Sequence, residues 1–100
     1  MGIKTTPFDV ADYLDSPEAV GAYLEEAFAT SDTALIALAI GDVARAKGMT
    51  AVAKKTGLSR ESLYKSLSET GNPELGTILK VMEAIGFSLS PKNQDSTQAA

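Results

Sequence analysis

The 100-residue sequence contains no cysteine, no histidine and no tryptophan. Without cysteine there is no disulfide framework and no thiolate metal site. Without histidine, the usual zinc sites and a histidine general base are excluded as well. A metal site made of oxygen ligands is still possible, but no group of acidic residues has the spacing of a calcium-binding loop. A Ser/Lys catalytic site would have to use residues such as Ser59 and Lys65, but these lie six residues apart on one short predicted helix, and no pocket is implied. We therefore expect no metal, no cofactor and no enzymatic activity.

Long hydrophobic runs are also missing. The longest, Ala34–Ile40, has seven residues, whereas a helix that spans a bilayer needs about 20. The N-terminal residues lack the basic and apolar pattern of a leader peptide. The apolar fraction of 44% is sufficient for the core of one small domain. We therefore expect a soluble, cytoplasmic protein with no membrane partner.

The formal net charge is −4, but the charges are unevenly distributed. Residues 1–32 contain one base and seven acids, a balance of −6, whereas residues 43–68 contain six bases and one acid, a balance of +5. Binding to phosphate groups depends on the local patch and not on the total. The segment 43–68 is therefore compatible with nucleic acid, and the acidic segment is compatible with a basic partner.

Helical spacing of apolar residues predicts an all-α fold. Ser16–Glu18 is typical of a helix start, with Ser as N-cap, Pro at the first helical position and an acid in the first turn. This helix is predicted to end near Ala29. The next is predicted to be capped by Ser31 or Asp32 and to stop at Gly48.

Four further elements are predicted before and after the central part of the chain. A short helix is expected from Asp9 to about Leu14, and the last helix from about Glu74 to Ile85. Alternation of apolar and polar residues in Phe87–Ser90 favours a short strand. Residues 91–100 are polar without periodicity and are expected to form a disordered tail.

The segment Thr50–Ser68 predicts two short helices joined by a tight turn. Ala53 is small enough to let the second helix approach closely, and Gly57 follows four residues later, where the chain must turn. Leu58 is expected to fill the corner and Leu63 to face the core. This pattern is typical of a helix-turn-helix motif, whose second helix lies in the major groove of DNA.

Side chains on the predicted second helix have the chemistry for reading base edges. Arg60 can donate two hydrogen bonds to O6 and N7 of guanine, and Glu61 can accept one from N4 of cytosine. Tyr64 and Lys65 lie one turn further on, within reach of a base or a phosphate. Hydroxyl groups at the predicted starts of both helices suit phosphate oxygens. The predicted DNA-binding residues are Thr50, Ser59, Arg60, Glu61, Tyr64, Lys65 and Asn72.

The run from Asn72 to Gly86 resembles the fourth-helix signature of phage-repressor-type domains (Cro/CI, or XRE-like). In that family an Asn-Pro turn commonly leads into a Thr-Leu-Leu-like helix that ends in Ala-Leu-Gly. Together with the two short helices, the resemblance covers about residues 32–86 and implies a lambda-repressor-like fold. Met49 stands where that family often has a phosphate-contacting Gln, so this contact is not carried over.

Over about residues 8–90 the chain resembles the probable addiction-module antidote proteins, a HigA-like group of antitoxins. The resemblance lies in Phe8–Leu14, Ser16–Glu18, Ala39–Met49, Thr56–Ser68 and Gly71–Pro73. It implies an antitoxin of a type II toxin-antitoxin module. Such a protein neutralises a small basic toxin of RelE/ParE-like fold and binds operator DNA to repress its own operon.

These expectations divide the chain into an N-terminal arm with helices (1–31), a helix-turn-helix domain (32–90) and the tail (91–100). One recognition helix covers one half-site, so useful specificity normally needs a two-fold dimer. We expect a homodimer, with the last helix and Phe87–Ser90 as candidate interfaces. Two alternatives stay open: a stand-alone phage-type transcriptional repressor without a toxin, and an adaptor that binds only protein.

Overall fold

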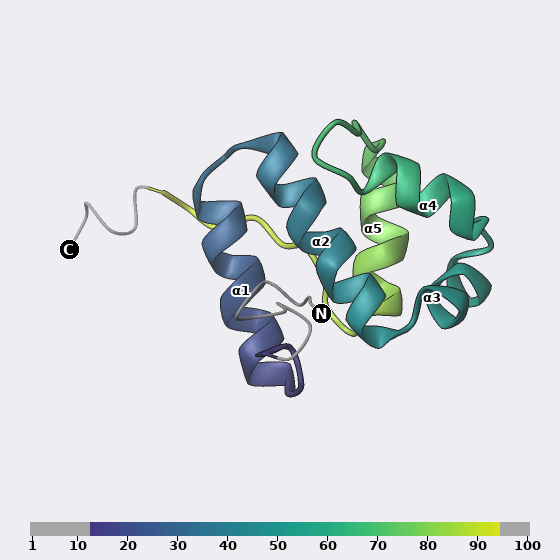
Figure 1. Ribbon diagram of the computed structural model, residues 1–100. Helices are drawn as coiled ribbons and strands as arrows, with labels where there is room; N and C mark the ends of the chain where they lie inside the picture. The colour runs from purple at the N-terminus through teal and green to yellow at the C-terminus, as the bar shows by residue number, and fades with distance from the viewer. Residues whose placement is uncertain (1–12, 95–100) are drawn as a thin grey trace, which may run out of the picture.

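The computed structural model describes residues 13–94 and consists of helices joined by short connections (Figure 1). No strand occurs among these residues. The all-α prediction is therefore confirmed for the described part of the chain. The helices are α1 (Pro17–Ala29), α2 (Thr33–Lys47), α3 (Met49–Thr56), α4 (Arg60–Ser66) and α5 (Leu75–Ala84).

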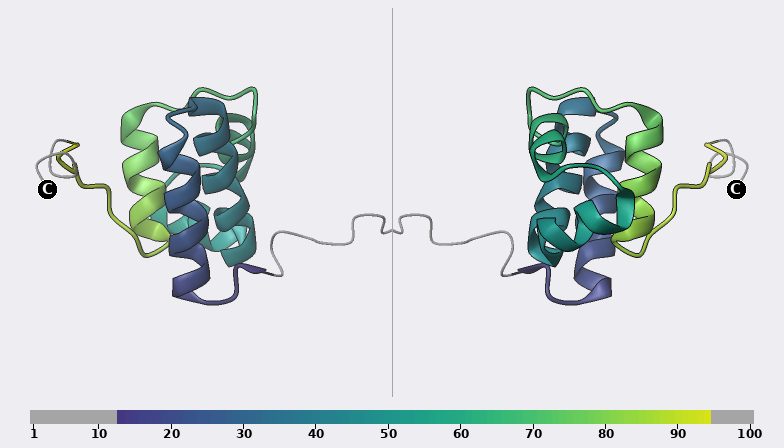
Figure 2. Two further views of the ribbon diagram at one scale, coloured as in Figure 1. Left: turned by 90° about the vertical axis from the view of Figure 1, so that its left-hand side faces the viewer. Right: turned by 90° about the vertical axis from the view of Figure 1, so that its right-hand side faces the viewer.

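The helices form two groups in space. Helix α1 is nearest the viewer in the left view of Figure 2, and α3 and α4 are nearest in the right view, so α2 lies between α1 and the pair α3–α4. Helix α1 packs against α2, whereas α3 contacts α2, α4 and α5, and α4 contacts α2 and α3. The acidic first helix and the basic pair α3–α4 therefore lie at opposite ends of the molecule.

Local sequence signals account for where the first two helices begin and end. The Ser16 side chain accepts a hydrogen bond from the backbone N–H of Ala19 at 3.1 Å, and Pro17 occupies the first turn. Asp32 caps α2 by accepting from the N–H of Ala34 at 3.0 Å. Gly48, at φ +106°, ends α2 in a conformation that other residues rarely adopt. The predicted bounds of these two helices are confirmed.

A single hydrophobic core joins all five helices. Val20, Ile40, Val52, Leu63 and Val81, one from each helix, are each at most 2% exposed. They belong to the same cluster of buried residues, to which Leu24 of α1 also contributes. Because α1 supplies part of this core, its position is fixed relative to the helices that follow.

The predicted strand at Phe87–Ser90 does not form. Gly86 ends α5 at φ +94°, and the chain then runs back along α1 without regular secondary structure. Phe87 and Leu89 pack against the core, and the Phe87 ring lies where a Cβ on Gly21 would be 3.5 Å away. The alternation of apolar and polar residues in Phe87–Ser90 therefore reflects a segment with one side on the core and the other in solvent. No segment within residues 13–94 pairs with it as a strand would. The predicted helix at Asp9–Leu14 and residues 95–100 of the predicted tail fall largely or wholly outside the described residues.

A polar contact links α1 to α2. The Tyr23 hydroxyl donates a hydrogen bond to Oδ2 of Asp42 at 2.5 Å, and Oδ1 of Asp42 accepts one from the guanidinium of Arg45. Burial, reinforced by the Asp42 carboxylate, raises the pKa of Tyr23 from 10.0 to about 12. The protonated phenol is thus favoured in the folded protein.

This raised pKa predicts a loss of stability at alkaline pH. Between pH 10 and 12 an unfolded Tyr23 has released its proton while the folded one retains it. The contribution of Tyr23 is therefore complete below pH 10 and disappears as the pH rises through about 12. In Tyr23→Phe this loss is absent, so the difference in free energy of unfolding between parent and variant should shrink from pH 9 to 12. Urea titrations at a series of pH values measure this difference directly, and a constant difference would contradict the prediction.

Candidate nucleic-acid interface

The candidate interface is formed by α3, the turn Gly57–Ser59 and α4. Gly57 has φ +77°, in the left-handed region, and its N–H donates to the carbonyl of Ala53 at 2.9 Å. Glycine adopts this conformation without a steric penalty, which is why α3 can stop there and the chain can reverse. The predicted turn at Gly57 is confirmed.

Thr56 stabilises this turn in a way that the sequence analysis did not identify. Its hydroxyl donates to the carbonyl of Val52 at 2.9 Å, and the same oxygen accepts from the N–H of Leu58 at 3.2 Å. One side chain thereby satisfies a carbonyl at the end of α3 and an amide of the turn. The sequence signal that could have predicted this interaction is the threonine directly before the glycine of the turn.

Buried leucines fix the orientation of α4. Leu63 and Leu67 are fully buried, and Leu58 packs against the core from the turn. Since these residues hold the inner face, the residues between them are turned to solvent. Ser59, Arg60, Glu61, Tyr64 and Lys65 are all exposed, so the structure brings five of the seven predicted residues together along α4.

Ser59 caps α4, as predicted. Its Oγ accepts a hydrogen bond from the N–H of Ser62 at 3.0 Å, while the side chain stays exposed. Glu61 follows in the first turn, where a negative charge interacts favourably with the helix dipole. The start of α4 is therefore defined by local interactions as well as by burial.

The basic side chains of this region are not neutralised within the described chain. In the part of the protein that the structure describes, a single ion pair forms, between Arg45 and Asp42 of α2. Lys54, Lys55 and Lys65 have no carboxylate partner there, and Arg60 lies over the ring of Tyr64, with 5.9 Å between the guanidinium carbon and the ring centroid. Positive charge on α3 and α4 is thus available to an external anion.

Thr50 does not cap α3, contrary to the prediction. Helix α3 begins at Met49 and its N-cap is Gly48, without a side-chain capping bond. The reason is that Gly48 ends α2 and starts α3 at the same residue, while the buried Met49 anchors the first turn in the core. Thr50 is exposed one residue inside the helix.

Asn72 lies near the end of α4 that carries Lys65, away from Arg60. It is exposed in the loop after α4, and its neighbour Gly71 packs so closely that a Cβ there would be 2.2 Å from the carbonyl oxygen of Ser66. The loop therefore folds back on the C-terminal end of α4. Arg60 is at the opposite end of this helix, about 10 Å away along its axis.

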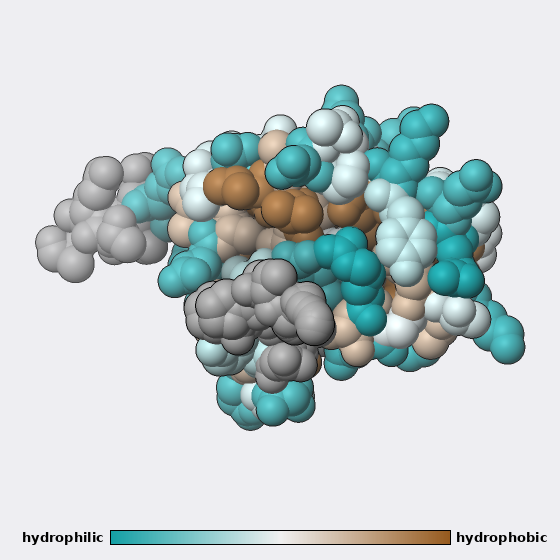
Figure 3. Space-filling model, viewed as in Figure 1, coloured by the Kyte–Doolittle hydropathy of each residue, from teal (hydrophilic) through white to brown (hydrophobic). Residues whose placement is uncertain are grey.

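The surface of the molecule differs between its two ends. In Figure 3 the surface around α3 and α4 is mostly hydrophilic, whereas hydrophobic surface gathers near the end of α1 and the first turns of α2. Leu35, which is 47% exposed, belongs to a shallow hollow between these two helices. A polar, basic surface suits nucleic acid better than a hydrophobic one does.

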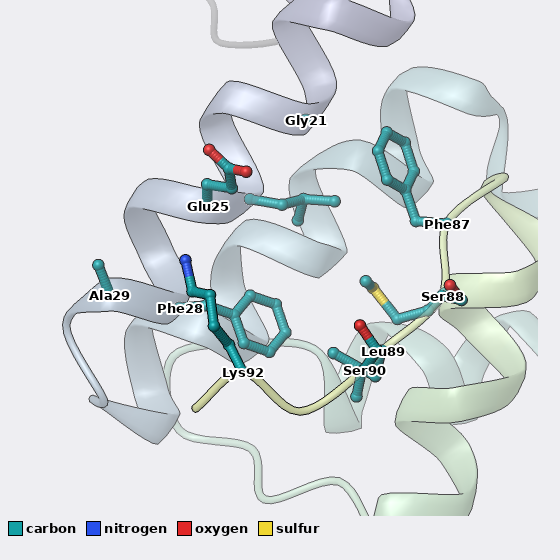
Figure 4. Close-up of a pocket in the computed structure, with 11 residues that line it drawn as sticks. Gly21, Glu25, Phe28, Ala29, Phe87, Ser88, Leu89, Ser90 and Lys92 are labelled. Atoms are coloured by element: carbon teal, nitrogen blue, oxygen red, sulfur yellow. The ribbon is translucent and has the colours of Figure 1, made fainter. Parts of the chain in front are cut away.

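A second hollow lies between α1 and residues 87–92 (Figure 4). Its volume is about 710 Å³, and apolar side chains such as Phe28, Phe87 and Leu89 line much of it. Glu25 and Lys92 are the charged residues among those that line it. Among residues 13–94 no three acidic side chains are grouped in a way that could hold a metal ion.

The geometry thus defines a small helical protein with an exposed, basic two-helix surface. None of the helices within residues 13–94 combines the length and the hydrophobicity needed to cross a bilayer. Comparison with known proteins identifies the family: the chain belongs to the one described as "Probable addiction module antidote protein", which it matches over residues 4–93. The resemblance to antidote proteins noted in the sequence is confirmed.

One curated relative is a protein of Haemophilus influenzae (strain KW20 / Rd) that is described as an uncharacterized protein. The two chains are 49% identical over 80 residues, which are 80% of this chain and 82% of the relative. No solved structure matches the chain.

Proposed function

We propose that this protein is a HigA-like antitoxin that neutralises a RelE/ParE-like toxin and binds operator DNA to repress its own operon. In this proposal α3 and α4 form a Cro/CI-type helix-turn-helix. The protein binds DNA as a homodimer, and α4 of each protomer enters the major groove at one of two half-sites. Repression is steric and requires no catalysis. Family membership supports the antitoxin role, because an antidote implies a toxin.

The observation that carries the DNA-binding part is the exposed outer face of α4. Arg60, Tyr64 and Lys65 project to solvent from a helix whose inner face is held by the fully buried Leu63 and Leu67. A rigid support of this kind is what base readout requires, because direct contacts depend on the placement of a few side chains.

The toxin-binding part is supported by the location of the acidic residues. Glu18, Glu25 and Glu26 are exposed on α1, at the other end of the molecule from α4, and none of them forms an ion pair with a described residue. A basic toxin on that side would leave α4 accessible to DNA. The proposal therefore assigns the two partners to different surfaces.

Two experiments test the proposal. Gel shifts with the DNA upstream of the protein's own gene should show specific binding that weakens as salt increases. Co-expression with the adjacent gene should yield a stable complex and restore growth to cells that the adjacent gene product inhibits. A salt-dependent shift with no toxin next to the gene would favour a stand-alone repressor, and absence of any shift would exclude both repressor functions.

Arg60→Ala tests the base contact. Removing a guanidinium that donates to O6 and N7 of one guanine should weaken operator binding by about 1–3 kcal/mol and relax base preference at one position. Titration of operator variants with single base-pair changes measures both effects. An unchanged preference at every position would show that Arg60 does not contact a base.

Lys65→Ala tests a phosphate contact. It should weaken binding to all sequences alike and reduce the slope of log K against log salt by about one unit. Lys92→Ala makes the same charge change beside α1, away from α4, and is the matched control. Equal slopes for both variants would mean that Lys65 acts only through overall charge.

A further inference from the structure

Arg60 and Tyr64 are in contact on the outer face of α4. The guanidinium carbon lies 5.9 Å from the centroid of the Tyr64 ring. The two residues are four apart in sequence, a spacing that places side chains next to each other along a helix. The contact is therefore built into the helix and does not depend on any other element.

Apart from the Tyr64 ring, no hydrogen bond or ion pair with a described residue orients the Arg60 side chain. Its guanidinium forms no ion pair with a described carboxylate, including that of Glu61, the acid beside it in sequence. The Tyr64 hydroxyl forms no hydrogen bond with a described residue, and the side chain is 42% exposed. The ring of Tyr64, and not its hydroxyl, makes the contact that the structure shows.

Arginine has several rotatable bonds, and ordering them opposes any contact it makes with a base. A guanidinium that already lies over an aromatic ring has fewer conformations to lose, since the planar group stacks on the ring face. Binding that uses such an oriented group is tighter than binding by a freely rotating one.

We infer that Tyr64 is a positioning residue for Arg60: its ring orients the guanidinium for a guanine in the major groove, and its hydroxyl takes no part in recognition. This inference rests on the proposed binding of operator DNA. It assigns base discrimination to a pair of residues, of which only Arg60 contacts the base.

Matched substitutions at position 64 test the inference on the protein's own upstream DNA. Tyr64→Phe keeps the ring and should retain the parent's affinity and base preference. Tyr64→Leu keeps an apolar side chain without a ring, and should reduce discrimination at the base pair read by Arg60 about two- to fivefold. In the Arg60→Ala background, Tyr64→Leu should have no further effect on that discrimination, because its effect passes through Arg60.

A measurement on the free protein separates this inference from the proposed function. The Tyr64 ring should shift the NMR resonances of the Arg60 δ-protons upfield in the parent and in Tyr64→Phe, and this shift should vanish in Tyr64→Leu. Leucine on an exposed helix face should not disturb the fold, which circular dichroism of the same sample checks.

Each outcome decides the matter. Loss of discrimination in Tyr64→Phe would show that the hydroxyl contacts DNA and would overturn the inference, as would unchanged discrimination in Tyr64→Leu. Operator binding by the parent without the ring-current shift would overturn the inference alone. Failure of the parent to bind its upstream DNA would overturn the DNA-binding proposal, and the inference with it.

Discussion

Gly41→Ala should lower the free energy of unfolding by about 3 kcal/mol, at the upper end for overpacking of a core. Gly41 is buried in the middle of α2, where the end of α4 crosses it. A Cβ at this position would lie 2.4 Å from the carbonyl oxygen of Leu67 and 3.1 Å from the Leu67 Cβ. The nearest atom is backbone, so the clash cannot be relieved by a side-chain rotation.

Gly76→Ala is the matched control for this prediction. Gly76 is also inside a helix, but it is exposed on α5, and nothing lies within 4 Å of the position of its Cβ. Alanine has the higher helix propensity, so this variant should gain up to about 1 kcal/mol. Urea denaturation followed by circular dichroism measures both variants, and the same sign of change in both would refute the role assigned to the crossing at Gly41.

Leu63→Ala should cost about 2–5 kcal/mol, the range for a large residue removed from a core. Leu63 is fully buried at the centre of α4, where it joins this short helix to the rest of the core. A helix of seven residues is not stable by itself in water. Its orientation therefore depends on this contact and on Leu67.

Leu75→Ala provides the comparison, since Leu75 is 67% exposed at the start of α5. Its free energy of unfolding should change by no more than about 0.5 kcal/mol. If α4 reads DNA as proposed, Leu63→Ala should also weaken operator binding under conditions in which the variant remains folded. A variant that lost stability but kept full operator affinity would show that α4 holds its orientation without Leu63.

Local signals predicted several elements correctly because the interaction concerned is itself local. Ser16, Asp32 and Ser59 accept hydrogen bonds from amides two or three residues further along the chain. Such a cap depends on residues close together in the sequence and not on the rest of the fold. The left-handed turn at Gly57 is likewise a property of one residue and its neighbours.

The failed predictions involved contacts between distant parts of the chain. Thr50 has the chemistry of an N-cap, but burial of Met49 in the core starts α3 two residues too early for it. Phe87 and Leu89 alternate as in a strand, but they pack on α1 and the core, and no described segment pairs with them. In both cases burial outweighed a local preference.

The sequence by itself determined the class of fold, the bounds of α1 and α2, the turn at Gly57 and the cap at Ser59, because periodicity and capping act over a few residues. It also carried the resemblance to antidote proteins that the family match confirms. Only the tertiary structure decided that Arg60, Tyr64 and Lys65 are all exposed on α4, and that Asn72 folds back near the Lys65 end of this helix, away from Arg60. The physical reason is that burial of Leu63 and Leu67 sets the rotation of α4, and which face is buried depends on helices far away in sequence.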